Sequence, residues 1–284
     1  MHKNVFHNDR VVPVEQARLS PGQAGLINGW GVFTTVRIFD GRPFAFERHW
    51  KRLSKDACRI QLPFDFAPDV VHARLGELLA ANQVSDGVAR LYFIYNKIGL
   101  WVSDEPLPVT DWLMYTGDRP VRAGPTQLAV EPHGRHAASP LAGAKVTSWL
   151  LNAWIVEQAH GRGFDDTLLL NERGHVTECT AANVYSVRGG VVETPPLSSG
   201  CLAGVTRELL LEIGPEIGLP IRERDLALEE LCEAEEVFIS STTREVQPIR
   251  QIEDRTIAQA PGPVTMAFAQ AFSDYVKRYF ARQS

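Results

Sequence analysis

The sequence has few cysteines, and none of them lie close together. The 284 residues contain four cysteines, Cys58, Cys179, Cys201 and Cys232, and no CxxC pair. Structural zinc sites and dithiol redox motifs are built on such pairs, so both are disfavoured. We expect four reduced, mostly buried thiols in a cytoplasmic protein.

Long apolar runs and basic blocks are also missing. No uninterrupted apolar run approaches the roughly 20 residues that span a bilayer, and the first ten residues, MHKNVFHNDR, lack the apolar middle of a signal peptide. The net charge is −5, which gives nucleic-acid binding no electrostatic support. These absences favour an acidic protein that binds neither membranes nor nucleic acids.

What is present is a mixture of strand and helix patterns. The segment 30–46 predicts two strands around the turn Asp40-Gly41, because it is rich in β-branched and aromatic residues. A hairpin over 166–187 and further strands at 88–96, 110–116 and 236–240 alternate with predicted helices. Those helices are expected at 47–60, 69–83, 147–160, 205–218, 227–234 and 264–281. Antiparallel hairpins among helices favour an α+β fold over a doubly wound parallel sheet.

The domain boundary is predicted from a shift in composition. Prolines and glycines become frequent between positions 117 and 143, as in linkers and loops. We expect an N-terminal α/β domain over 1–118, a linker over 119–124 and a second domain over 125–284. With 44% hydrophobic residues, the chain can bury a core in each.

Lys145 is the only fully charged residue between Arg135 and Glu157. A lysine in apolar surroundings loses solvation of its ammonium group, so its neutral amine becomes available as a nucleophile. Such an amine can form an imine with an aldehyde or ketone. The alternative is a lysine whose ammonium reaches water from the start of a helix.

Three other stretches offer partners for a carbonyl cofactor such as pyridoxal 5′-phosphate. In 200-GCLAGVTRELLLE-212, a glycine-containing loop enters a helix whose first N–H groups suit a phosphate. Hydroxyls and amides in 240-SSTTRE-245 are a second phosphate candidate, or an ordinary turn. Glu178 is the only charge between His175 and Arg188. It needs a positive partner, which could be a pyridinium or an arginine.

Taken in order, several motifs resemble one known family. They are GWGVFTTVRIFDGR, HWKRL, SPLAGAK, GHVTECTAANVY, TPPLSSGCLAGVTRELL and EVFISSTTREVQPI, between about residues 24 and 250. Together they resemble the class IV, fold-type IV, pyridoxal-phosphate-dependent enzymes. That family includes branched-chain and D-amino-acid aminotransferases and aminodeoxychorismate lyase.

The resemblance implies a role for each matched position. Lys145 would form the internal aldimine and then carry a proton between the substrate's α-carbon and the cofactor. The implied cofactor-binding residues are Arg52, Glu178, Leu202, Val205, Thr206, Ser241 and Thr242. The expected substrate contacts are Thr35, Arg37, Lys97 and Thr243. The family also implies a small N-terminal domain, a larger C-terminal pseudo-barrel domain that binds the cofactor in the interdomain cleft, and a homodimer.

The reaction remains open between two branches. The resemblance favours an aminotransferase acting on an amino acid or amine and a 2-oxo acid. The pattern Phe33-x-Thr35-x-Arg37 is more similar to aminodeoxychorismate lyase, which releases pyruvate, although 88-VARLYFIYNK-97 lacks the arginine-glycine run expected there. An alternative outside the family is a metal-dependent hydrolase that binds its metal ion through His133 and His136. The sequence offers no third ligand at a suitable spacing from these two histidines. A non-catalytic relative would not need Lys145 and Glu178.

Overall fold

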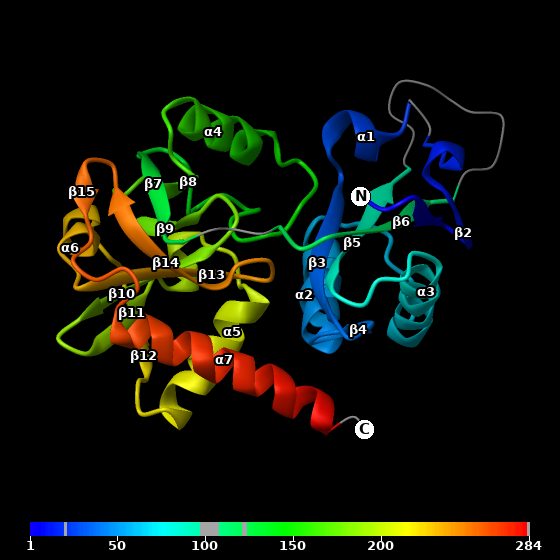
Figure 1. Cartoon of the computed structure of the whole chain (residues 1–284). Helices are drawn as coiled ribbons and strands as arrows, with labels where there is room; N and C mark the ends of the chain where they lie inside the picture. The colour runs from blue at the N-terminus through cyan, green and yellow to red at the C-terminus, as the bar shows by residue number, and fades with distance from the viewer. Residues whose placement is uncertain (20–21, 97–107, 121–123, 283–284) are drawn as a thin grey trace. The chain divides into compact units, whose positions relative to one another are not determined.

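The computed structural model describes residues 1–19, 22–96, 108–120 and 124–282 (Figure 1). The chain divides into two compact units. Unit 1 is Met1–Pro120 with Ala144–Trp149, and unit 2 is Val121–Gly143 with Leu150–Ser284. The sequence placed all of 125–284 in one domain, whereas the segment that carries Lys145 groups with unit 1. The reason is strand-like pairing, because Val146 bridges Val32 and Thr147 N–H donates to Gly31 O at 2.9 Å.

Unit 1 contains an antiparallel sheet of six strands among the described residues, in the order β2-β1-β6-β5-β3-β4. The strands are β1 (Asn4–His7), β2 (Arg10–Pro13), β3 (Gly31–Phe39), β4 (Arg42–Pro43), β5 (Gly87–Tyr95) and β6 (Thr110–Gly117). The turn between β3 and β4 is the predicted one. Asp40 and Gly41 have φ of 48° and 71°, and a two-residue hairpin turn with both central residues at positive φ favours this pair.

The helices of unit 1 cover one face of this sheet. Its helical elements are η1 (Val14–Gln16), α1 (Ala24–Asn28), α2 (Phe46–Arg59) and α3 (Pro68–Ala81). Alternate residues of β3, Val32, Val36 and Ile38, are fully buried in a core that they share with Leu53 of α2 and Leu75 of α3. The two-residue period of a strand therefore turns Phe33, Thr35 and Arg37 to the opposite face.

Unit 2 is built on a curled, mixed sheet of nine strands among the residues described. Eight follow the order β12-β11-β10-β13-β14-β7-β8-β9, and β15 pairs with β14. The strands are β7 (Thr126–Glu131), β8 (Asp166–Leu170), β9 (Val176–Cys179), β10 (Asn183–Arg188), β11 (Val191–Thr194), β12 (Ile221–Glu223), β13 (Glu236–Ser241), β14 (Glu245–Ile252) and β15 (Arg255–Thr256). The pairs β7–β8, β7–β14 and β11–β12 are parallel.

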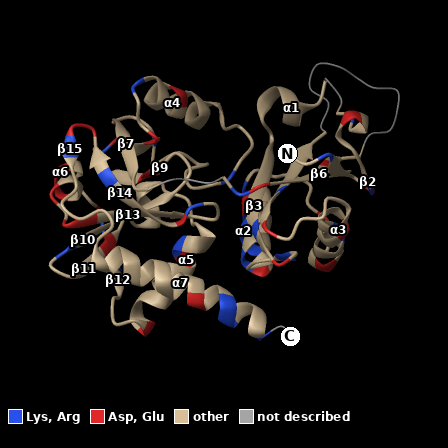
Figure 2. Cartoon of the chain, in the orientation of Figure 1, with Lys and Arg blue, Asp and Glu red and all other residues tan. Residues whose placement is uncertain are grey.

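Helices pack around the sheet of unit 2, as Figure 1 shows for α5 and α7. The helical elements are α4 (Leu150–Gly161), η2 (Leu197–Ser199), α5 (Val205–Glu216), α6 (Leu228–Cys232) and α7 (Pro263–Ala281). Val184, Ile239 and Ile249 are fully buried in the core of this sheet. In α7, Phe268 and Phe272 are buried, while the charged residues gather in its C-terminal half (Figure 2).

Most elements predicted from the sequence are confirmed, including the helices at 47–60, 69–83 and 264–281 and the α+β class. Two predictions were wrong in detail. The strand expected over 176–187 is interrupted by a turn, where Cys179 N–H donates to Ala182 O at 2.7 Å. Helix α4 begins at Leu150 rather than 147, because the residues before it pair with β3. The sequence missed the short helix α1 and the strands β1, β2, β7, β11, β12, β14 and β15.

The cysteine prediction is partly confirmed. All four cysteines are free thiols, but only Cys179 and Cys201 are buried, and Cys58 is exposed. Burial raises the pKa of the Cys201 thiol to about 11, which disfavours the reactive thiolate. Of the helices that the structure describes, none combines the length and the apolar character needed to cross a membrane.

Candidate active site

Lys145 is held on both sides of its backbone within unit 1. Its carbonyl accepts a hydrogen bond from Phe33 N–H at 3.2 Å, and its N–H donates to Asp56 Oδ2 at 3.1 Å. The Lys145 Nζ lies 4.5 Å from the centroid of the Phe33 ring. An aromatic face attracts a cation without offering it a counter-charge. The apolar surroundings predicted for this lysine therefore include a specific aromatic neighbour.

One face of α2 contributes polar groups to the same region. His49, Arg52 and Asp56 recur at helical spacing, so their side chains project from one side of the helix. The Thr34 hydroxyl lies 2.9 Å from His49 Nδ1 and accepts from Arg52 Nη2 at 3.0 Å. Burial, together with the charges of Arg52 and Lys145, holds the pKa of His49 well below its ordinary value of 6.5. The imidazole is therefore neutral and adds no third positive charge.

The sheet face that carries Phe33 also carries two tyrosines and an arginine that the sequence did not single out as a group. Tyr92 stacks on Phe33 with ring centroids 5.2 Å apart, and its hydroxyl lies 3.3 Å from that of Tyr115. Arg90 Nη1 lies 3.4 Å from each of these hydroxyls. Burial raises the pKa of Tyr92 to about 12, so its hydroxyl remains a donor. The alternation along β5 was the signal that could have grouped Arg90 with Tyr92.

The three predicted substrate contacts in the N-terminal part of the chain, Thr35, Arg37 and Lys97, differ in their surroundings. Thr35 is buried on the Phe33 face and is paired across the strands with Arg90. Arg37 has a structural environment: its guanidinium donates to Gly87 O at 2.8 Å and to Asp86 Oδ1 at 2.6 Å, and it packs on Phe39. These contacts anchor the end of β3, and a substrate contact for Arg37 stays a prediction. Lys97 lies outside the described residues.

Glu178 is the centre of a second cluster, in unit 2. It lies on β9 and is only 7% exposed. Its Oε1 accepts from Arg135 Nε at 2.9 Å, and its Oε2 accepts from Leu202 N–H at 3.0 Å. Arg135 in turn donates to Asn152 Oδ1 at 3.1 Å. The arginine partner that the sequence left open is thus present, and the contact brings two predicted residues, Glu178 and Leu202, together.

The start of α5 has the features of an anion site. Gly204 is the N-cap residue, and no side chain caps the helix, so the N–H groups of the first turn are available to a ligand. Val205 and Thr206 are both buried. A Cβ at position 204 would lie 2.2 Å from Asn183 Oδ1, while Asn183 Nδ2 donates to Leu202 O at 2.9 Å. Glycine is therefore required where the loop enters the helix.

The turn after β13 contains Ser241, Thr242 and Thr243, all of them half-buried. The Ser241 hydroxyl accepts from Arg244 N–H at 3.3 Å, which leaves its own O–H able to donate. The Arg244 guanidinium forms a buried ion pair with Asp166 of β8. This pair ties the turn to the neighbouring part of the sheet.

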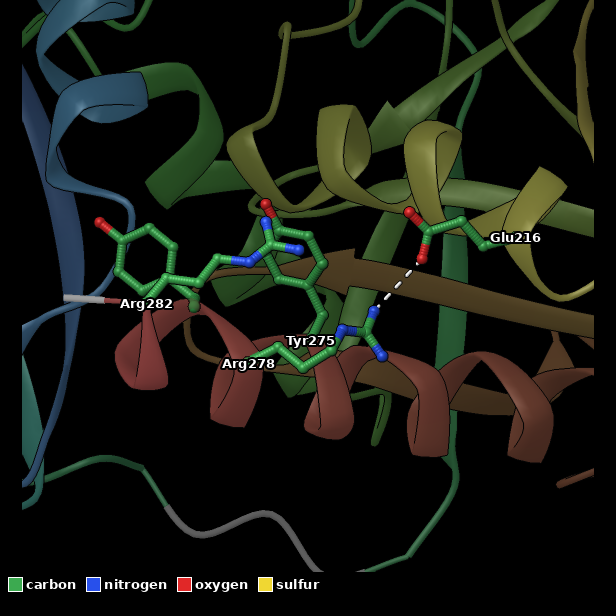
Figure 3. A pocket seen from close by; sticks show the side chains of 5 residues that line it. Glu216, Tyr275, Arg278 and Arg282 are labelled. Carbon is green, nitrogen blue, oxygen red and sulfur yellow. Dashed lines mark hydrogen bonds and ion pairs between the residues drawn. The ribbon is translucent and has the colours of Figure 1, made fainter. Parts of the chain in front are cut away.

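Two further features lie away from these clusters. A pocket of about 260 Å³ between α5 and the end of α7 is lined by Glu216, Tyr275, Arg278, Tyr279 and Arg282, and Figure 3 shows the ion pair from Arg278 to Glu216. It contains none of the predicted site residues. Within the described ranges, no group of three or more histidine, cysteine or acidic side chains is arranged to hold a metal ion.

Comparison with known proteins gives a consistent result. The family described as amino-transferase class IV matches residues 31–252. A branched-chain-amino-acid aminotransferase of Salmonella typhimurium is 26% identical, covering 94% of this chain and 91% of its own length. A D-alanine aminotransferase of Listeria innocua is 29% identical and covers 96% of each chain. The crystal structure of a branched-chain aminotransferase from Thermoproteus uzoniensis with norvaline superposes with a TM-score of 0.89 at 27% identity, covering 97% of this chain and 95% of that one.

Proposed function

The chain belongs to the class IV aminotransferases, enzymes that depend on pyridoxal 5′-phosphate, and from this premise we propose that it moves an amino group between an amino acid or amine and a 2-oxo acid. The observation that carries the proposal is Lys145, whose backbone is fixed at both polar groups and whose Nζ lies against an aromatic ring. A lysine placed for solubility would need neither feature.

The described residues fit the cofactor in three respects. Glu178 offers a buried carboxylate whose oxygens keep acceptor capacity beside Arg135 and Leu202 N–H. The α5 start offers first-turn N–H groups behind a glycine that has no room for a Cβ. Arg52 offers a guanidinium that Thr34 helps to orient. These are an acceptor for a ring N–H, a cradle for a phosphate, and a cation for its charge.

We assign the roles as follows. Pyridoxal phosphate supplies an aldehyde that condenses with amines and a ring that delocalises the electron pair left when an α-proton departs. Lys145 presents the amine for the aldehyde and carries the proton that leaves the substrate α-carbon. Glu178 would accept the N–H of the pyridinium. The phosphate would be held by Arg52, by Val205 and Thr206 N–H, and by Ser241 and Thr242, while Leu202 would pack on the ring.

For the substrate we propose a carboxylate-bearing compound. Arg90 lies beside the hydroxyls of Tyr92 and Tyr115, which gives a polar group on the Phe33 face. Thr35 on that face and Thr243 in unit 2 remain proposed contacts. Arg37 also remains a proposed contact, although Asp86 and Gly87 O already accept hydrogen bonds from its guanidinium. Amino transfer is the function that we put forward, because the matching family model is that of the class IV aminotransferases. Aminodeoxychorismate lyase stays the alternative.

The test combines trapping with a product assay. The purified protein is loaded with pyridoxal phosphate, reduced with borohydride and digested, and the phosphopyridoxyl tag is located by mass spectrometry. We expect the tag on Lys145, and a tag on Lys51 or Lys55 of α2 would refute the assignment. L- and D-amino acids are then offered with 2-oxoglutarate or pyruvate, and aminodeoxychorismate in a separate arm. Pyruvate release from the last compound, without amino transfer elsewhere, would replace our function with the lyase.

Glu178→Gln is the matched variant for the ring contact. It keeps the shape of the side chain and removes the charge that a pyridinium needs, so we expect turnover to fall about 10²–10³-fold. Glu172→Gln, which changes an exposed carboxylate of the loop after β8, serves as the control. Equal activity in the two variants would exclude Glu178 from the cofactor site.

We also propose a homodimer, with α4 in its interface. Leu150, Leu151 and Trp154 are 81%, 53% and 54% exposed, and their spacing places them on adjoining parts of the helix surface. A cluster of large apolar side chains of this kind favours burial against another protein surface. Sedimentation of the wild type should give twice the 31.6 kDa chain mass, and Trp154→Glu should give the monomer. A monomeric wild type would refute the dimer.

A further inference from the structure

The backbone of Lys145 is fixed by contacts that span unit 1. On one side the segment pairs with β3, through Phe33 N–H to Lys145 O and Thr147 N–H to Gly31 O. The Thr147 hydroxyl adds a bond to Gly29 O at 2.7 Å. On the other side the Lys145 N–H meets the carboxylate of Asp56, which belongs to α2. The direction in which the lysine side chain leaves the backbone therefore depends on both contacts.

Asp56 is an unusual choice for a helix residue facing a core. It is 4% exposed, although a buried carboxylate loses its hydration and requires compensating partners. Burial raises its pKa from the ordinary value of 3.8, and the Lys145 N–H and the charges of Arg52, Arg59 and Lys55 act against that rise. A serine or alanine would fill the position without this cost. The contact with Lys145 gives a physical reason for an acid here.

We propose that Asp56 is a positioning residue that holds the main-chain N–H of Lys145 and so directs its amine across the face of Phe33. A hydrogen bond from an amide to a carboxylate is shorter and stronger than one to a neutral acceptor. Losing it would free the segment between Gly143 and Val146 to rotate, while the β3 pairing still holds its far side. The inference rests on the proposed function only in that Lys145 is taken as the reactive amine, because the contact itself involves no cofactor.

The first measurement observes the bond directly. The chain has six lysines, and only Lys145 follows an alanine, so labelling with ¹³C-carbonyl alanine and ¹⁵N-lysine selects its amide in an NMR spectrum. In Asp56→Ala we expect hydrogen exchange at this amide to accelerate by about tenfold or more. Asp56→Asn keeps an acceptor oxygen and should remain within about threefold of the wild type. Asp65→Ala removes an exposed carboxylate of the same unit and should change nothing.

The second measurement asks whether the bond positions the amine. Pyridoxal phosphate is added to cofactor-free protein, and the visible absorbance of the bound cofactor is followed in time. Asp56→Ala should slow its appearance several-fold, with Asp56→Asn restoring most of the rate. A wild-type rate in Asp56→Ala would refute the positioning role, and unchanged exchange at the Lys145 amide would refute the bond itself.

The two outcomes separate this inference from the proposed function. A wild type that develops no absorbance with pyridoxal phosphate would refute the function, while the amide exchange would still decide whether Asp56 holds Lys145. If Asp56→Ala does not fold, Asp56→Asn and Asp56→Ser carry the test. Serine is too short to maintain the 3.1 Å contact, so Asp56→Ser should behave as alanine does, and protection in that variant equal to the wild type would overturn the proposal.

Discussion

The lysine cluster of unit 1 and the glutamate cluster of unit 2 balance their charges in different ways. In unit 2 two buried acids face an arginine: Glu178 pairs with Arg135, and Asp166 pairs with Arg244. Buried Glu236 instead accepts hydrogen bonds from Val264 N–H and from the N–H and hydroxyl of Thr265. In unit 1 two cations, Lys145 and Arg52, both act on His49, which its surroundings keep neutral, so the imidazole adds no further positive charge.

This difference has a functional meaning. Two cations in one region attract an anion that binds beside them. A buried carboxylate held by an arginine presents an acceptor with a fixed direction. The first property suits a phosphate or a carboxylate, and the second suits the N–H of a pyridinium. The proposed roles of Arg52 and Glu178 follow these two properties.

The largest effect is expected when Lys145, the proposed reactive amine of unit 1, is removed. Lys145→Ala should lower turnover by about 10⁴-fold or more, as loss of a catalytic nucleophile does in other enzymes. Its free energy of unfolding should change by no more than about 2 kcal/mol, because a cation–π contact contributes little more than that. Steady-state kinetics and urea unfolding measure the two quantities. Lys55→Ala, an exposed change on α2, is the control, and retained turnover in Lys145→Ala would contradict the whole assignment.

The next largest effect is expected at the buried ion pair of unit 2, between Asp166 and Arg244. Asp166→Asn leaves the Arg244 guanidinium buried without its charge partner, and Arg244 Nη1 already has no hydrogen-bond partner among the described residues. We expect the free energy of unfolding to fall by about 3–5 kcal/mol. The double variant with Arg244→Met should regain much of this loss, because the uncompensated charge is gone. A loss below about 1 kcal/mol in the single variant would show that pairing matters less in unit 2 than we argue.

A smaller effect is expected on the pH dependence of stability, through His49, whose positive charge is suppressed in the folded protein. The folded pKa of His49 lies below 6.5, so below that pH the unfolded chain binds a proton that the folded chain does not. Stability should therefore decrease as the pH falls from 7.5 to 5.5, by up to about 1.4 kcal/mol per pH unit for one proton. His49→Asn, which keeps a partner for Thr34, should flatten this slope.

The carboxyl of Asp56 also affects that slope. Burial raises its pKa from 3.8, so it acts in the opposite direction at lower pH. The window above 5.5 limits its contribution. His160→Asn changes an exposed histidine of α4 and should leave the slope as it is. An equal slope in wild type and His49→Asn would mean that His49 is charged in the folded protein.

The sequence pointed to the candidate reactive residues more readily than to the residues that contact them. Lys145 and Glu178 were conspicuous as lone charges in apolar segments, and the α5 start was visible as glycine leading into a helix. Asp56 and Arg135 were not, because they lie 89 and 43 positions from Lys145 and Glu178. The contact of Arg37 with Asp86 could not be predicted for the same reason, since the two residues are 49 positions apart. A local sequence pattern can point to a candidate reactive residue, but only the fold shows which distant residues contact it.

The smallest effect is expected at an ion pair that is exposed, and it tests whether pairing or burial gives unit 2 its stability. Arg278 and Glu216 are joined at 3.2 Å, like the buried pairs, but their side chains are 51% and 58% exposed (Figure 3). Water screens such a pair and its side chains lose entropy on pairing, so Arg278→Ala should cost no more than about 0.5 kcal/mol of unfolding free energy. Urea unfolding at low and high salt should give nearly the same small value. A loss above about 2 kcal/mol would mean that pairing by itself stabilises unit 2, and the contrast with Asp166 and Arg244 would then no longer rest on burial.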